Sequence, residues 1–277
     1  MSAALQSSVI DMKFQIDHDY HIHSQISACS NDPDQTPERV LRYAQDNGLS
    51  RIVLTDHFWD SAVPGASNWY KPQDFDRIVR SLPLPQTENV EFLFGAETDM
   101  DMNMTIGVAD SRWDAFDFVI IPTTHMHMRG FTISEENGAT ARGRADAWLR
   151  RLDTIFSRDL PFHKIGIAHL ACGLIAPTNE MYRQTLDLLP DSRLEELFKG
   201  CAQVGVGVEL NLGDMAFKNG NEDRIIHLFR IAKEAGCKFY CGSDAHHPAE
   251  FGAYISTMEY VVSKLGLDES DKFQIQK

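Results

Sequence analysis

The chain has 277 residues, of which 43% are hydrophobic and 24% are charged, and its formal net charge is −14. These proportions are ordinary for a soluble globular protein, and no apolar stretch is long enough to cross a bilayer, which excludes a transmembrane helix. The negative charge repels nucleic-acid phosphates and argues against a nonspecific DNA- or RNA-binding protein, whereas bound divalent cations would still admit a small phosphorylated substrate.

Strands and helices are predicted to alternate along the whole chain. Strands are predicted at residues 14–21, 51–55, 90–96, 116–121, 164–168, 206–211 and 238–242. Helices are predicted between them at residues 37–47, 74–82, 143–157, 192–204 and 222–235. The first helix has the clearest ends, because Thr36 can cap it, Pro37 suits its first position and Gly48 follows its last turn.

Strands that alternate with helices form parallel sheets with right-handed crossovers. Seven such units without a Pro/Ser-rich linker predict an α/β fold, a (β/α)7 TIM-like barrel that is closed or nearly closed. The barrel would be a single domain covering residues 1–277, with residues 1–12 as a candidate N-terminal extension. An open, doubly wound sheet is the alternative. We favour the barrel because the candidate ligands named below follow the ends of several strands, where barrels carry their chemistry.

The most informative motif is His21-Ile22-His23, at the end of the first predicted strand. Alternation sends side chains i and i+2 to the same face of a strand, so His21 and His23 can converge on one point. Further histidines and carboxylates end later strands, in Thr55-Asp56-His57, Gly95-Ala96-Glu97, Thr124-His125, Ala168-His169 and Ser243-Asp244-Ala245-His246. Converging imidazoles and carboxylates are typical ligands of divalent transition metals, so the pattern predicts a centre with more than one ion.

Polar residues beside these motifs have expected supporting roles. Asp19 and Asp56 directly precede ligand candidates, and we expect them to orient histidines rather than to bind metal. His127 shares the strand-side parity of His125, and we prefer His125 as the ligand because it lies closer to the strand end. Glu209-Leu210-Asn211 ends the sixth strand, and one of its two polar residues is expected to point into the barrel mouth.

In this order the motifs resemble those of the polymerase-and-histidinol-phosphatase (PHP) superfamily, over nearly the whole chain. The resemblance implies a distorted seven-stranded β/α barrel whose two or three divalent ions, zinc, manganese or iron, hydrolyse phosphate esters. It implies that one ion is held by His21, His23, Glu97 and Asp244, that Glu97 bridges to a second held by His125 and His169, and that a third is held by His57 and His246.

The chain departs from the family's pattern shortly after the first motif, where members commonly carry an acidic or other ligating residue that supports the third metal. Ala28 cannot ligate, and either Cys29 or Asp32 is a candidate substitute. The two alternatives stay open at the level of sequence.

The expected mechanism is in-line attack on phosphorus by a metal-activated water, since coordination lowers the pKa of water from about 15.7 towards 7. The expected catalytic residues are His57, Asp244 and His246. Either histidine, where it is not firmly ligated, could protonate the leaving alkoxide.

Two long loops, residues 59–72 and 127–141, follow ligand-bearing strands and are candidates for substrate walls. Arg129, Arg142 and Arg144 flank the second loop, and guanidinium forks suit phosphate oxygens; solvated salt bridges are the alternative. His127 and His247 are further candidates for substrate contact, with a solvated loop position as the alternative for His247.

The leading functional prediction is a phosphoesterase that cleaves a small phosphomonoester, with histidinol phosphate as the candidate that the resemblance supplies. A phosphodiesterase or nuclease of the same superfamily is one alternative, and the acidic charge disfavours it. An amidohydrolase is a further alternative, but the sequence offers no persuasive candidate for its carbamylated lysine. A non-catalytic metal-binding barrel is another, and an open, carboxylate-lined mouth fits it less well. The N-terminus lacks a secretory signal and the cysteines form no Cys-x-x-Cys motif, so we expect a cytoplasmic protein.

Overall fold

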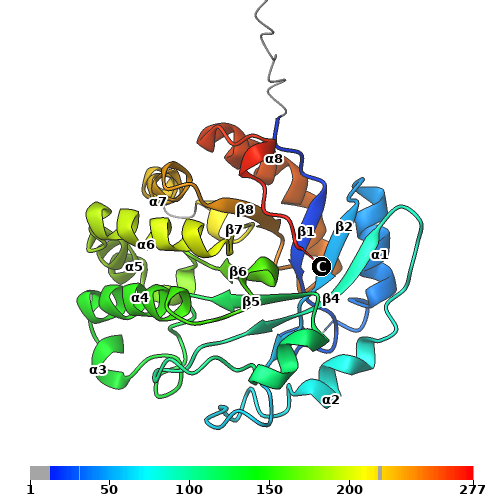
Figure 1. Ribbon diagram of the computed structural model, residues 1–277, viewed down its shortest axis with the longest axis horizontal. Coiled ribbons are helices and arrows are strands. Elements are labelled where there is room, and N and C mark those ends of the chain that lie inside the picture. The colour runs from blue at the N-terminus through cyan, green and yellow to red at the C-terminus, as the bar shows by residue number, and fades with distance from the viewer. Residues whose placement is uncertain (1–12, 31, 218–219, 277) are drawn as a thin grey trace, which may run out of the picture.

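Parallel strands form the wall of a nearly closed barrel in the computed structural model, which describes residues 13–30, 32–217 and 220–276 (Figure 1). In order around the wall they are β1 (His18–Ile22), β2 (Arg51–Leu54), β4 (Glu91–Thr98), β5 (Phe118–Pro122), β6 (Ile165–Ala168), β7 (Gly207–Asn211) and β8 (Lys238–Gly242). The short strand β3 (His57–Phe58) pairs with the end of β4. The predicted seven-stranded α/β barrel is confirmed, and the open-sheet alternative is wrong.

The first and last strands close the wall around its carboxyl end. Asp244 N donates to His21 O at 2.7 Å, and His23 N donates to Ala245 O at 3.0 Å. Further towards the amino end a side chain makes the link, because Cys241 N donates to His18 Nε2 at 3.0 Å. The mouth in which the predicted ligands lie is therefore bounded by strands on every side.

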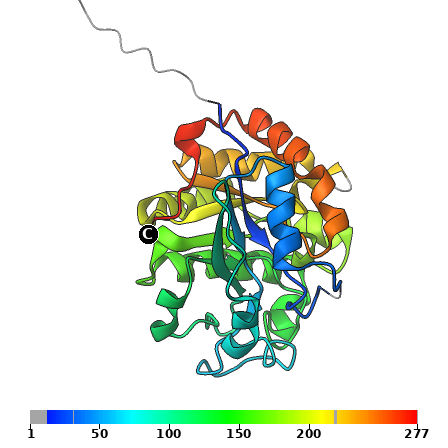
Figure 2. The same cartoon turned by 90° about the vertical axis from the view of Figure 1, so that its right-hand side faces the viewer.

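Helices cover the outside of the strands (Figures 1 and 2). Within the described residues they are α1 (Pro37–Asp46), α2 (Phe75–Ile78), α3 (Glu135–Gly138), α4 (Ala141–Phe156), α5 (Asn179–Asp187), α6 (Asp191–Val204), α7 (Glu222–Glu234) and α8 (Tyr254–Leu265). The predicted cap of α1 is confirmed, since Thr36 Oγ1 accepts from Arg39 N at 3.3 Å. No helix in this part of the chain has the length and apolarity to cross a membrane.

Some predicted boundaries differ from the structure for local reasons. β1 begins at His18 rather than at residue 14, because its neighbour β2 begins at Arg51, the partner of His18. The predicted helix at residues 74–82 is helical only to Ile78 and continues as a 3-10 turn, Val79–Ser81, ahead of Pro83, which disfavours helical backbone before it. α3, α5 and α8 were not predicted. The candidate extension at residues 1–12 lies outside the described residues.

The barrel interior is apolar at its amino end. Tyr20, Phe118 and Tyr240 pack there with Phe273 and Ile275 from the C-terminal segment. This segment is tied to the barrel by main-chain bonds, with Phe273 N donating to Phe239 O at 2.8 Å and Gln276 N to His163 O at 3.3 Å, and it crosses the barrel in Figure 1. An apolar plug at one end leaves the polar side chains to gather at the other.

Candidate metal centre

The structure brings all eight predicted metal ligands together at the carboxyl end of the barrel. They are His21, His23, His57, Glu97, His125, His169, Asp244 and His246. The two histidines of the opening motif converge as expected, with His21 Nε2 and His23 Nε2 3.2 Å apart. All of these side chains except Asp244 and His246 are buried.

A β-bulge turns His21 into the mouth. The register of β1 against β2 shifts between Asp19, which pairs with Ile52, and Ile22, which pairs with Leu54, so β1 carries one extra residue there. A bulge changes which side chains face inward. Tyr20 consequently packs in the barrel interior while the next residue, His21, also faces the centre.

Glu97 lies at the middle of the cluster. Its Oε2 is 3.0 Å from His57 Nδ1, 3.2 Å from His23 Nε2 and 3.5 Å from His21 Nε2. Its Oε1 faces the opposite way, 3.7 Å from His169 Nε2 and 4.0 Å from His125 Nε2. One carboxylate therefore presents an oxygen to each of two groups of histidines, which is the arrangement that a bridging ligand requires.

Asp244 contacts both groups from the opposite wall. Its Oδ1 is 3.3 Å from His21 Nε2 and 3.2 Å from His23 Nε2, and its Oδ2 is 3.5 Å from His169 Nε2. Asp244 and His169 have positive φ angles of 55° and 54°. Non-glycine residues adopt this left-handed conformation at a cost, and such residues cluster at functional sites.

The donor set fits divalent cations. An ion about 2.1 Å from each ligand places neighbouring donors about 3.0 to 3.4 Å apart, depending on its geometry. The contacts of His21 and His23 with each other, Glu97 Oε2 and Asp244 Oδ1 span 3.2 to 3.5 Å. Both oxygens of Glu97 are also buried without a hydrogen bond from any described residue. Buried carboxylate oxygens need a partner, and a cation is one that this ring of nitrogens can hold.

Opposite charges shift the pKa values of the central groups. Burial alone would lower the pKa of His23, but the Asp244 and Glu97 carboxylates overcome burial and raise it to about 9. Burial would raise the pKa of Glu97, yet the neighbouring His57 and His21 hold it well below its usual range. His23 thus retains its proton near pH 7 in the metal-free centre, and ligation by this side chain releases it.

His57 and His246 have the opposite electrostatics. Burial, opposed by Glu97 and reinforced by the charge of His23, lowers the pKa of His57. Burial and the charge of His23 lower the pKa of His246 to about 3. Both imidazoles are therefore neutral near pH 7, which is the form that binds metals.

Carboxylates behind the ligands orient them. Glu209 Oε1 accepts from His21 Nδ1 at 2.6 Å, and its Oε2 accepts from the main-chain N of His169 at 3.1 Å. Asp99 Oδ2 lies 3.3 Å from His125 Nδ1, and Asp214 Oδ1 lies 3.6 Å from His169 Nδ1. These groups fix which ring nitrogen is free to ligate.

Sequence reasoning found these supporting residues only in part. Glu209 belongs to the polar pair expected at the mouth, whereas Asp99 and Asp214 were missed. Asp99 follows Glu97 at the i+2 spacing that shares a strand face, a signal that was available. Asp56 supports a ligand through a relay, because its Oδ1 accepts from Ser27 Oγ at 2.8 Å, and Ser27 Oγ lies 3.0 Å from His23 Nδ1.

Asp19 acts on the main chain rather than on an imidazole. Its Oδ1 accepts from His21 N at 3.2 Å and from Ser243 N at 2.9 Å, which joins the ends of β1 and β8. Burial raises the pKa of Asp19 to about 7, although hydrogen bonds from Ser243, His21 and Tyr43 oppose that shift. The expected orientation of a histidine ring by Asp19 is therefore replaced by support of the ligand-bearing backbone.

The three predicted phosphate-binding arginines do not lie with the ligands. Arg144 is buried, and its guanidinium donates to the carbonyls of Gly138, Met126 and Ile175, so its prediction as a phosphate clamp is corrected to a structural role. Arg129 lies 3.4 Å from Glu135, and Arg142 lies 3.8 Å from Asp146 on the surface of α4. These contacts match the solvated salt bridges that were the alternative.

The predicted histidine contacts differ in position. His125 and His127 both line the cavity over the centre, but His127 is exposed, whereas His125 is buried with its Nε2 4.0 Å from Glu97 Oε1, and its role as the ligand stays a prediction. His247 Nδ1 lies 3.5 Å from Asp32 Oδ2, outside that cavity lining. His127 therefore stays a candidate for substrate contact, and His247 occupies the solvated position that was the alternative.

Two cavities meet at the centre. One of about 470 Å³ is lined by metal-ligand candidates together with Trp69, Tyr70, His127, Met128 and Leu174. The other, of about 560 Å³, is more polar and includes Asn179, Tyr182 and Asp214. His169, Leu174 and Asp244 line both. The loop at residues 59–72 thus supplies Trp69 and Tyr70 to the cavity wall, and contact of this wall with substrate stays a prediction.

Comparison with known proteins identifies the fold. No protein-family model matches the sequence, and none of the curated proteins matches it significantly. A crystal structure of histidinol phosphate phosphatase from Lactococcus lactis, complexed with zinc, L-histidinol and phosphate, aligns with a TM-score of 0.63 at 18% identity, over 94% of this chain and 99% of that chain. A dihydropteroate synthase from Coxiella burnetii, in complex with pteroic acid, aligns at 13% identity over 92% of this chain and 95% of that chain, but the TM-score of 0.43 is too low to support a shared fold. The chain has the fold of a histidinol phosphate phosphatase, which is the fold that its resemblance to the PHP superfamily implied.

Proposed function

We propose that the protein is a metal-dependent phosphoesterase that hydrolyses a small phosphomonoester. The observation that carries this proposal is Glu97, a buried carboxylate whose two unpartnered oxygens face two separate groups of histidines. His21, His23, Glu97 and Asp244 would hold one cation, and Glu97, His125 and His169 a second. Such ions, when bound, lower the pKa of water and neutralise charge on a phosphoryl group.

The protein's own residues would position the reactants. Asp244 lines both cavities and keeps a quarter of its side chain exposed, so it can accept a hydrogen bond from the attacking water. His57 and His246 were predicted both as ligands and as proton donors to the leaving alkoxide. Their lowered pKa values favour ligation, because an acid must carry the proton that it gives away.

The cavity favours a small substrate. A volume of about 470 Å³ suits a small organic group, and the lining includes the rings of Trp69, Tyr70 and His127. Neither cavity has a lysine or arginine among its described lining residues. A polymer with several phosphates would need such cations along its path, so these features support a phosphomonoester over a nucleic acid. Histidinol phosphate is the first substrate to test, because L-histidinol and phosphate, the two products of its hydrolysis, are bound in the similar Lactococcus structure.

The test is hydrolysis by protein reconstituted separately with zinc, manganese and iron, on histidinol phosphate, p-nitrophenyl phosphate and a single-stranded oligonucleotide. We expect metal-dependent phosphate release from the monoesters, reduced roughly 100-fold or more in His21→Ala because a metal ligand is lost. The matched control is His227→Ala, since His227 lies on the surface of α7 beside Asp191. Stoichiometric metal with no turnover on any ester above the His21→Ala background would instead identify a non-catalytic metal-binding barrel.

A further inference from the structure

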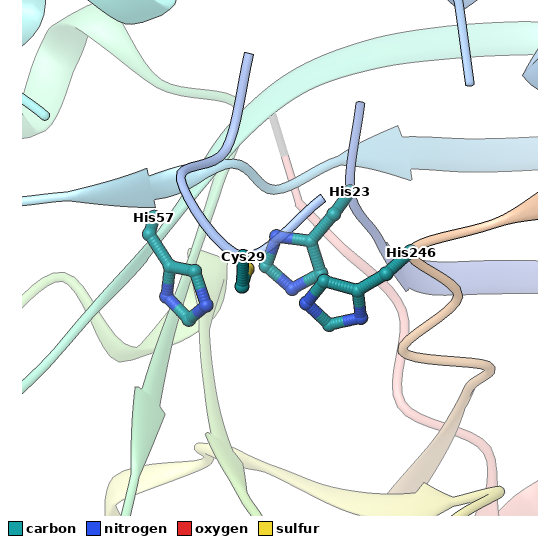
Figure 3. Close-up of side chains that lie close together, drawn as sticks. All are labelled: His23, Cys29, His57 and His246. Atoms are coloured by element: carbon teal, nitrogen blue, oxygen red, sulfur yellow. The ribbon is translucent and has the colours of Figure 1, made fainter. Parts of the chain in front are cut away.

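One of the two cavities opens over most of the predicted metal ligands. Its lining, which encloses about 470 Å³, includes six of them: His57, Glu97, His125, His169, Asp244 and His246. The other cavity has only His169 and Asp244 among its described lining residues. Figure 3 shows part of the first lining, with Cys29 between the rings of His57 and His23 and with His246 on the other side of His23. A phosphoryl group bound by cations at these ligands therefore leaves the organic group of its ester in this first cavity, named here the apolar cavity.

The rest of the apolar cavity's wall carries no fixed charge. Its described residues are Cys29, Trp69, Tyr70, His127, Met128 and Leu174. None of them is a carboxylate, a lysine or an arginine, and a free thiol behaves as a small apolar group. Trp69 and Leu174 keep 36% and 40% of their surface exposed, so the apolar wall reaches the solvent. Large apolar side chains that stay exposed around a cavity are typical of a binding site for an apolar group.

The loop before α2 holds the Trp69 ring in place. The ring lies edge-on to His57, with centroids 5.0 Å apart, and edge-on to Tyr70, with centroids 4.7 Å apart. Tyr70 is fully buried in an aromatic cluster. The main-chain oxygen of Trp69 accepts from Nε2 of the buried Gln73 at 3.1 Å. A ring that is fixed before it meets a ligand loses little entropy on binding, so Trp69 is suited to pack against a second ring.

Neither cavity has a carboxylate left for a charged amine among its described lining residues. Glu97 and Asp244 are predicted metal ligands, and the acidic residue that remains in the two linings is Asp214. Asp214 is 4% exposed, its Oδ2 accepts from Ala171 N at 3.1 Å, and its Oδ1 lies 3.6 Å from Nδ1 of the ligand candidate His169. An ammonium group would lose water in these cavities without gaining a counter-charge, which is unfavourable.

We infer that the apolar cavity selects a phosphomonoester whose alcohol is uncharged and carries an aromatic ring that packs against Trp69. This inference rests on the proposed function and deepens it by naming the class of substrate. Attack by water forms the new P–O bond, the P–O bond to the alcohol breaks, and the alcohol leaves with a proton from that water. Trp69 contacts the departing alcohol rather than the phosphoryl group, so it determines specificity.

Three monoesters of primary alcohols separate recognition of the ring from the reactivity of the leaving group. Glycerol 1-phosphate is uncharged in its alcohol but lacks a ring, and histidinol phosphate has a ring but also an ammonium group. We expect kcat/KM of the zinc-loaded protein for 2-phenylethyl phosphate to exceed the values for both at least about tenfold.

Variants of Trp69 test the residue itself. Trp69→Ala should lower kcat/KM for 2-phenylethyl phosphate about tenfold and for glycerol 1-phosphate less than about twofold, because the contact with the ring is lost. Trp69→Phe, which keeps a ring, should restore most of the preference. Tyr260→Ala is the matched control, since Tyr260 is an aromatic residue of α8 that is 44% exposed and lines neither cavity.

A binding measurement on the unaltered chain needs no turnover and covers the case in which Trp69→Ala fails to fold. Trp69 is 36% exposed, whereas Trp59, Trp113 and Trp148 are at most 7% exposed, so acrylamide should quench mainly the fluorescence of Trp69. The non-hydrolysable 2-phenylethylphosphonate should remove most of this quenching in the zinc-loaded protein, and ethylphosphonate should leave it unchanged. Quenching that 2-phenylethylphosphonate does not reduce would overturn the inference. Hydrolysis that is no faster with 2-phenylethyl phosphate than with the other two esters refutes this inference alone, and protection from quenching without hydrolysis of any ester refutes the proposed function alone.

Discussion

Replacement of Glu209 by glutamine is the most incisive test of how the barrel holds its histidines. Glu209 lies on β7, fully buried, and its carboxylate connects two ligands: Oε1 accepts from His21 Nδ1 at 2.6 Å and Oε2 from His169 N at 3.1 Å. Because both partners donate, a carboxylate satisfies both. Glutamine has nearly the same shape, but its amide nitrogen must face one of these donors, so one contact becomes repulsive.

The expected magnitude follows from the type of bond that is lost. A buried hydrogen bond to a charged group contributes about 1.5 to 3 kcal/mol, and loss of such support behind a ligand typically weakens metal affinity about 10- to 100-fold. Those factors equal about 1.4 to 2.8 kcal/mol of binding free energy. We therefore expect Glu209→Gln to weaken zinc binding by about 10- to 100-fold and to lower kcat/KM at limiting zinc by a similar factor.

Competition with a chromogenic chelator measures the zinc affinity directly. Glu234→Gln is the matched control, because Glu234 is exposed at the end of α7. Thermal unfolding of both metal-free variants shows whether Glu209→Gln acts on the site or on the whole fold. Zinc affinity equal to that of the control, in a folded Glu209→Gln protein, would refute the reasoning that Glu209 orients His21.

Three further predictions follow from the same contacts. The pKa of His23 is raised from 6.5 to about 9, so its protonation stabilises the metal-free fold. This stabilisation, on the order of 3 kcal/mol, is present in full below pH 6.5 and is lost as the pH rises to about 9. Zinc affinity should rise over the same interval, and chelator competition together with thermal unfolding from pH 6.5 to 9 would show both trends or neither. Gly242→Ala should lower the free energy of unfolding in urea by about 1 to 3 kcal/mol, because the added Cβ would overlap the Glu209 carboxylate. In the control Gly200→Ala, the side chain nearest to the added Cβ is that of Phe156 at 3.9 Å, so the fold should be unchanged or more stable. Arg151→Met should cost about 3 to 5 kcal/mol of unfolding free energy by leaving Asp99, 3.6 Å away, as an uncompensated buried charge, and an unchanged urea midpoint would contradict this ion pair's structural role.

Most ligand candidates of the centre could be predicted from the sequence, because they lie on or directly after strands whose periodicity is visible there. His21 and His23 share a strand face, and the other ligand candidates follow apolar runs whose carboxyl ends meet at one mouth. Local pattern also contained information that was not used. The buried residues of α8, Tyr254, Met258, Val261, Val262 and Leu265, have the helical i, i+4, i+7, i+8, i+11 spacing, so the missed helix was visible in the sequence.

What could not be predicted depends on contacts between distant segments. No periodicity shows that the first turn of α4 packs under a loop, so that Arg144 donates to three carbonyls instead of facing substrate. The position of Cys29 beside His57 and His246 likewise depends on anchoring of its loop by Gln73, more than forty positions away. The bulge that turns His21 inward is a property of the pairing between β1 and β2, which neither strand specifies alone.

The correction at Arg144 alters the electrostatic argument for the whole site. The chain carries a formal charge of −14, and neither cavity has a lysine or arginine among its described lining residues. In the metal-free mouth the carboxylates of Glu97 and Asp244 are offset by the proton that they hold on His23, and no lysine or arginine of the described lining adds positive charge for a phosphate dianion. Divalent cations held by these same carboxylates would displace that proton and make the local field more positive. In the proposed function, metal loading therefore controls substrate binding as well as turnover, whereas an arginine clamp would have separated the two.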